Sequence, residues 1–184
     1  PARRPTTPSS SMSDFASRFG PVAVVAGASE GLGAAFATAL ASRGLNLVLL
    51  ARREAPLKAF ARSLEEKFGV SCLALTIDVA APDAADRLEA ELDALSLDVG
   101  LLVYNAAAAL VSNFVDTPVD VVDNIVDTNV RGLARFCHAL APRLVARGRG
   151  GLLLMSSMSS VRGHALGATY AASKAFTTSL GEGL

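Results

Sequence analysis

The sequence has 184 residues, with 17 Lys and Arg against 17 Asp and Glu, and a mean hydropathy of +0.40. This length suffices for one domain that needs no disulfide or metal to fold, and the balanced charge does not indicate nucleic acid as a partner. The longest apolar runs, residues 22–28 and 101–111, are shorter than the roughly 18 to 20 residues of a membrane-spanning helix, so we expect buried strands and no membrane span.

Two features bear on the compartment and on the domain boundary. Cys72 and Cys137 lie in apolar stretches without metal-ligand spacing, which predicts reduced core thiols and a cytoplasmic protein with no metal site. Residues 1–18 are predicted to be a disordered leader, because their first part combines Pro, Ser, Thr and Arg without periodicity. An organelle presequence is the alternative, although no amphipathic apolar face accompanies the arginines. Residues 19–184 are predicted to form one domain.

From residue 21 onward, short apolar runs alternate with longer helical stretches. The predicted strands are residues 22–26, 45–50, 71–77, 99–104 and 152–155. The predicted helices are residues 34–42, 57–68, 82–95, 119–146 with a kink at Pro142, and 168–184. This alternation is typical of an α/β fold, a doubly wound parallel sheet whose ligand crevice lies beyond the carboxyl ends of the strands.

A glycine-rich turn follows the first predicted strand and opens the first helix. Backbone amides at such a helix N-terminus can receive a pyrophosphate, and glycine lets the chain turn tightly and approach a ligand. The alternative is a tight connection that needs glycine only for packing. The candidate dinucleotide-binding residues of this turn are Gly27, Ser29, Glu30, Gly31, Leu32 and Gly33.

The end of the second predicted strand bears on the cofactor. An acid about 20 residues after the glycine turn is typical of NAD sites, whereas an arginine there favours the 2′-phosphate of NADP. Arg52 follows Gly33 by 19 residues, and Arg53 comes next. The sequence therefore predicts NADP, with NAD as the weaker alternative, although both arginines could instead solvate the next helix and Glu30 counts against a nearby phosphate.

Three residues near the end of the chain are candidates for the chemistry. Tyr170 and Lys174 are four residues apart, so they share one face of the last predicted helix. A free phenol has a pKa near about 10, and a neighbouring ammonium would stabilise the phenolate for proton exchange. Ser157 follows the fifth predicted strand on the ligand side of the sheet, so a loop could bring it and Tyr170 to one carbonyl group.

Together these motifs resemble the short-chain dehydrogenase/reductase family. Its Thr-Gly-x-x-x-Gly-x-Gly turn matches residues 26–33, and its Asn-Asn-Ala-Gly segment matches residues 104–107. The resemblance implies a Rossmann-like fold in which Ser157 holds the substrate oxygen, Tyr170 passes the proton, and Lys174 binds the nicotinamide ribose. It also implies that Asn129 is the helix asparagine of a proton relay, rather than a surface amide.

The family resemblance further implies cofactor contacts after the third and fourth strands. Asp78, which could instead only cap a turn, and Val79 would lie at the adenine. Asn105, Ala106 and Ala107 would lie along the adenosine ribose. The chain departs from the family at Ala26, Tyr104 and Ala107, where the family has threonine, asparagine and glycine. It also stops at Leu184, so we expect the last strands and the substrate lid to be absent.

The resemblance implies an NADP-dependent oxidoreductase that acts on a carbonyl or alcohol group of a small, hydrophobic substrate, and a homodimer or homotetramer. Phe114, Val115 and Val161 hint at such a substrate, but packing in the core is the favoured interpretation. Two alternatives remain open at this point. One is a catalytically silent dinucleotide-binding module, and the other is an NAD-dependent nucleotide-sugar epimerase or dehydratase.

Overall fold

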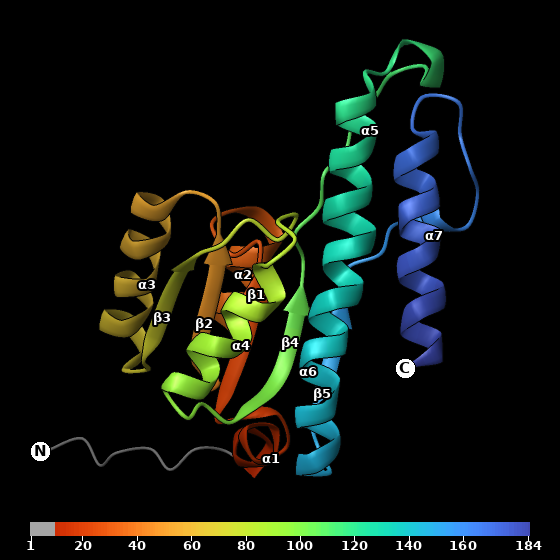
Figure 1. Cartoon of the computed structure of the whole chain (residues 1–184). Coiled ribbons are helices and arrows are strands. Elements are labelled where there is room, and N and C mark those ends of the chain that lie inside the picture. The colour runs from red at the N-terminus through yellow and green to blue at the C-terminus, as the bar shows by residue number, and fades with distance from the viewer. Residues whose placement is uncertain (1–9) are drawn as a thin grey trace, which may run out of the picture.

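A five-stranded parallel sheet forms the centre of the molecule, with strand order β3-β2-β1-β4-β5 (Figure 1). The structure is a computed structural model that describes the backbone of residues 10–184 and the side chains of residues 14–184. The strands are β1 (Val22–Ala26), β2 (Asn46–Ala51), β3 (Cys72–Thr76), β4 (Val99–Tyr104) and β5 (Gly151–Leu154). The predicted doubly wound α/β fold is confirmed.

The central strands are buried on both faces, which explains their continuous aliphatic sequences. Successive side chains of a strand point to opposite faces. Val22 and Val24 accordingly belong to one core cluster, and Ala23 and Val25 belong to the other. Each cluster binds a different layer of helices to the sheet, so the strand register fixes the positions of both layers.

Helices cover both faces of the sheet. On one face lie α2 (Gly31–Ala41) and α3 (Glu54–Phe68), and on the other lie α4 (Ala84–Ala94), α6 (Leu133–Arg147) and α7 (Ala168–Gly183). None of the described helices is long and apolar enough to cross a membrane. From β1 the chain winds in one direction through β2 and β3, and then in the opposite direction through β4 and β5. The topology therefore has the switch point between β1 and β4 at which a ligand crevice is expected, beyond the carboxyl ends of these strands.

A continuous helical rod occupies the region predicted as one helix over residues 119–146. The rod consists of α5 (Val119–Val126), a wider turn of π type, η2 (Asp127–Gly132), and α6, which contains Pro142. It extends past the carboxyl edge of the sheet, and α7 runs beside it (Figure 1). The wide turn, which the periodicity of the sequence does not reveal, places the buried Thr128 against the end of β4 and the buried Asn129 against α7.

The first described helix, α1 (Ser10–Phe19), corrects the prediction of a disordered leader for residues 10–18, while residues 1–9 lie outside the described part. Phe15 and Phe19 are four residues apart, and their ring centroids lie 4.9 Å from each other. Both rings pack against the core cluster on the α2 side of the sheet. This burial of aromatic surface stabilises the helix, and the composition of the segment concealed that contribution.

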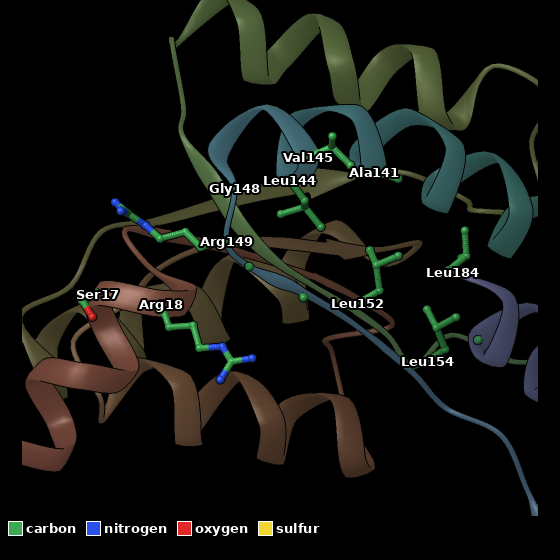
Figure 2. A pocket seen from close by; sticks show the side chains of 13 residues that line it. Ser17, Arg18, Ala141, Leu144, Val145, Gly148, Arg149, Leu152, Leu154 and Leu184 are labelled. Carbon is green, nitrogen blue, oxygen red and sulfur yellow. The ribbon is translucent and has the colours of Figure 1, made fainter.

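An apolar hollow of about 830 Å³ lies along β5. Figure 2 shows Leu152 and Leu154 of β5 at this hollow, with Leu144 and Val145 of α6 and Leu184 around it. Within the described residues, β5 pairs only with β4, so its other edge carries no strand. The hollow contains none of the candidate catalytic side chains.

Candidate active site

A second cleft, of about 480 Å³, opens at the carboxyl ends of the strands. This volume lies within the usual range of ligand pockets. Most of the predicted cofactor contacts line it: Gly27, Ser29, Glu30, Arg52, Asp78, Val79, Asn105, Ala106 and Ala107. The structure therefore brings together the segments that follow β1, β2, β3 and β4.

Close backbone approaches explain two glycines of the turn between β1 and α2. Gly27 has φ +78°, and a Cβ there would lie 2.8 Å from the backbone of Ala106. A Cβ on Gly33 would collide with the carbonyl of Gly27. Gly31 has φ +57° and faces open space, so its role is conformational. Gly31, Leu32 and Gly33 form the first turn of α2 and do not line the cleft.

The charged residues around the cleft have different surroundings. Arg53 forms an exposed ion pair with Glu30, at 2.8 Å between Nη2 and Oε2, and does not line the cleft. Arg52 does line it and forms no ion pair with any residue of the described chain. Asp78 accepts a hydrogen bond from the amide of Ala80 at 3.1 Å, so it caps a turn and lines the cleft.

The loop after β4 is held by two asparagines. Asn105 donates from Nδ2 to the carbonyl of Gly27 at 3.4 Å. Asn129 is 2% exposed; its Oδ1 accepts from the amide of Ala108 and its Nδ2 donates to the carbonyl of Ala108, both at 2.8 Å. Asn129 Nδ2 also donates to the hydroxyl of Ser173 at 3.0 Å. Asn129 thus joins the floor of the cleft to α7 and is not a surface amide.

The buried ammonium of Lys174 lies where α7 meets the end of β5. Its Nζ donates to the carbonyl of Met155 at 2.7 Å and lies 5.7 Å from the centroid of the Tyr170 ring. Burial lowers the pKa of Lys174 from its ordinary value. Among residues 14–184, no carboxylate forms an ion pair with Lys174. Its positive charge is therefore not neutralised by the described residues.

Ser157 lies in the segment that follows β5. It caps the short helix η3 (Met158–Ser160), where its Oγ accepts from the amide of Ser159 at 3.2 Å, and η3 contacts α7. The preceding Ser156 donates from Oγ to the carbonyl of Lys174 at 3.0 Å. Ser157, Tyr170 and Lys174 are thus parts of one connected region at the carboxyl edge of the sheet.

Sequence reasoning missed two polar residues of the cleft, Asn124 on α5 and Thr128 in η2. Thr128 directly precedes Asn129, so the candidate asparagine was a signal for it, whereas no motif marks Asn124. Tyr170 and Lys174 do not line this cleft and lie in α7 instead. Phe114, Val115 and Val161 are between 59% and 89% exposed, so packing in the core does not account for them.

The lowered pKa of Lys174 predicts a pH effect on stability. Between the lowered pKa and the ordinary lysine value, the unfolded chain binds more protons than the folded protein, so the free energy of unfolding rises with pH over that interval. We expect the variant Lys174→Met to lose this rise and the exposed-site variant Lys67→Met to keep it. Urea unfolding across alkaline pH measures both. An unchanged pH dependence in Lys174→Met would contradict the assignment.

Comparisons with known proteins agree with this geometry. The family model described as short chain dehydrogenase matches residues 21–184. The chain is 36% identical over 181 residues to a very-long-chain 3-oxoacyl-CoA reductase of Laccaria bicolor, covering 96% of this chain and 53% of the relative. The chain thus spans about half the length of that curated relative.

Two solved structures have the same fold. A 7beta-hydroxysteroid dehydrogenase superposes with a TM-score of 0.87 at 28% identity, covering 92% of this chain and 64% of that one. A short-chain dehydrogenase from Sphingobium yanoikuyae in complex with NADPH superposes with a TM-score of 0.83 at 33% identity, covering 89% and 64%. The match to the family model over nearly the whole described chain shows that this protein belongs to the short-chain dehydrogenase family.

Proposed function

We propose that this site transfers a hydride between NADP(H) and a carbonyl or alcohol group of a small, hydrophobic substrate. The observation that carries the proposal is the buried ammonium of Lys174, held over the ring of Tyr170 at the same edge of the sheet as the cleft. Family membership and the NADPH complex of the Sphingobium relative support it. Reduction would add a hydride to the carbonyl carbon and a proton to its oxygen.

The residues around the cleft fit a dinucleotide. Glu30 precedes α2 without a side-chain cap, so the first amides of this helix are available to an anion. The glycine turn would hold the pyrophosphate, Asp78 and Val79 the adenine, and residues 105–107 the ribose. When bound, the nicotinamide supplies or accepts the hydride. The protein's own contribution is orientation and charge.

The catalytic roles are assigned to four residues. Tyr170 exchanges the proton with the substrate oxygen, and Ser157 donates a hydrogen bond to that oxygen. Lys174 favours the phenolate of Tyr170 through its charge and binds the nicotinamide ribose. Asn129 takes the place of the helix asparagine of the proton relay. Asn129 also has a structural role, because its hydrogen bonds to Ala108 and Ser173 keep the floor of the cleft at a fixed distance from α7.

A hydrophobic substrate is supported by the segments that flank the catalytic residues. The amide of Ser112 donates to the carbonyl of Leu166 at 3.0 Å, which joins the segment after β4 to the segment after η3. Both segments expose large apolar side chains: Leu110, Val111, Phe114, Val115, Met158, Val161 and Leu166. The Laccaria relative is named for a very-long-chain 3-oxoacyl-CoA, which combines a keto group with a long apolar chain.

We further propose a homodimer or homotetramer in the cytoplasm. Val119 and Val126 expose apolar surface on α5, which a second copy could cover. Cys72 and Cys137 are free, and burial raises the pKa of both thiols to about 11, which suits a reducing compartment. Light scattering measures the mass in solution, and a monomeric mass would contradict the proposed oligomer. Cell fractionation checks the proposed cytoplasmic location.

The variant Tyr170→Phe tests the proton-transfer role. It keeps the ring and removes the hydroxyl, so we expect kcat to fall by about 10² to 10⁴ with little change in NADPH affinity. The assay follows NADPH oxidation with long-chain 3-oxoacyl thioesters, hydrophobic ketones and steroid ketones, and NADPH affinity is measured by fluorescence titration.

The matched control for this experiment is Ser179→Ala, an exposed position on the same helix. We expect its kcat to equal that of the unmodified protein. Full activity of Tyr170→Phe, or no reduction of any compound in the panel by the unmodified protein, would overturn the proposed function.

The preference for NADP over NAD rests on Arg52, which lines the cleft without an ion-pair partner in the described chain. Removing a charge-assisted hydrogen bond costs about 1.5 to 3 kcal/mol, so we expect Arg52→Ala to weaken NADPH binding by roughly 10- to 100-fold. NADH binding should not change, because NADH lacks the 2′-phosphate.

Arg62→Ala, an exposed position on α3 that does not line the cleft, is the control for Arg52→Ala. Fluorescence titration measures the affinity of each of the two variants for NADPH and for NADH. Equal loss of NADPH and NADH affinity in Arg52→Ala would show that Arg52 supports the binding of either dinucleotide and does not select NADPH. No loss would show that Arg52 does not contact the cofactor.

A further inference from the structure

Tyr104 occupies a central position behind the proposed catalytic residues. It is the last residue of β4 and is 3% exposed, with its ring edge-on to Phe136 at 5.7 Å between centroids. Its hydroxyl donates to the carbonyl of Thr128 at 2.7 Å, and its own carbonyl accepts from the amide of Met155 at 3.0 Å. One buried residue therefore binds both the helical rod and the end of β5.

Both partners of Tyr104 support α7. Thr128 lies in η2 next to Asn129, whose Nδ2 donates to Ser173 of α7. The hydroxyl of Ser173 in turn donates to the carbonyl of Tyr170 at 2.7 Å. On the other side, the carbonyl of Met155 accepts from Nζ of Lys174. The side chain of Lys174 is thus two hydrogen bonds away from Tyr104, and the backbone carbonyl of Tyr170 is three.

The residue opposite the Tyr104 hydroxyl is a glycine, Gly132, which leaves room for it. Gly132 ends η2, and a Cβ built there would lie 2.7 Å from the Tyr104 hydroxyl and 2.5 Å from the carbonyl of Val79. Any larger residue would force the rod away from β4. The absence of a side chain at Gly132 therefore allows the Tyr104 to Thr128 hydrogen bond to form.

The phenol of Tyr104 stays protonated and can therefore donate to Thr128. Burial raises its pKa far above the ordinary value, with smaller contributions from Cys137 and Asp78. It therefore keeps its proton at every pH at which the protein is assayed. The carbonyl of Thr128 needs such a donor, because a buried carbonyl without a partner is costly.

We propose that Tyr104 is a positioning residue of the reaction: its hydroxyl fixes η2 and thereby the turn of α7 that bears Tyr170, while its carbonyl holds Met155, which binds Lys174. This inference rests on the proposed function. Tyr104 does not touch the reacting atoms in this assignment, so its effect on the rate of the chemical step exceeds its effect on cofactor binding. Displacing reacting groups by about 1 Å can cost as much as 10²-fold in rate.

The test is Tyr104→Phe, which removes only the hydroxyl. With the panel compound that the unmodified protein reduces fastest, we expect kcat to fall between about 10-fold and 100-fold. KM and NADPH affinity should change much less than kcat, since Tyr104 itself does not line the cleft. Tyr104→Phe should also shift the pH profile of kcat, because the relation between Tyr170 and Lys174 changes.

Phe136→Leu is the matched control, because it disturbs packing against the Tyr104 ring and leaves the hydroxyl bond. We expect it to lower the melting temperature without lowering kcat. Gly132→Ala supplies a second route, since it displaces the rod from Tyr104, and it should reproduce the loss of kcat. It replaces Tyr104→Phe as the test if that variant does not fold.

Two outcomes separate this inference from the proposed function. In the first outcome, Tyr170→Phe is inactive but Tyr104→Phe and Gly132→Ala have the same kcat as the control Phe136→Leu. The positioning role of Tyr104 is then wrong, and the proposed function stands. If Tyr170→Phe is fully active, the proposed function is wrong, and the positioning role fails with it. In the Tyr170→Phe background, Tyr104→Phe should cause no further loss, because both act on one step.

Discussion

The site depends on an ammonium group that the fold removes from water without pairing it with a carboxylate. Burying a charge costs several kcal/mol unless hydrogen bonds compensate. For Lys174 the carbonyl of Met155 and the face of the Tyr170 ring offset part of that cost, and the lowered pKa of Lys174 reflects the remainder. A carboxylate partner would neutralise the charge. Within the described residues no carboxylate pairs with the ammonium, which lies beside the Tyr170 ring.

Such a charge requires rigid surroundings, and the hydrogen bonds around α7 provide them. Ser156 binds the carbonyl of Lys174, while Met155 binds its side chain, so two successive residues after β5 hold one residue of α7 from both ends. Asn129 and Ser173 hold the preceding turn. Because these contacts come from β5, η2 and α7 together, a displacement of any one element would move the ammonium relative to the phenol.

Most of the fold and much of the site could be predicted from local sequence. Aliphatic runs predicted the strands, and the glycine turn, Arg52 and Asp78 were assigned to a cleft that the structure contains. Contacts between distant residues could not be predicted. Tyr104 binds the carbonyl of Thr128 across 24 residues, and Arg53 pairs with Glu30 across 23. The helix α1 escaped prediction because its stability comes from packing of Phe15 and Phe19.

The alanines after β4 follow from the same geometry. Gly27 and Ala106 approach so closely that a side chain at position 27 would collide with the backbone of Ala106, and the amides of Asn105 and Ala106 both donate to the carbonyl of Ala26. Ala108 is held through its backbone by Asn129. Backbone groups, the side chain of Asn105 and one distant asparagine hold this loop, so its alanine side chains contribute little to its position. Replacement of the family's glycine by Ala107 therefore leaves the cleft intact, and the constraint shifts to Asn105, Asn129 and the residues that hold η2.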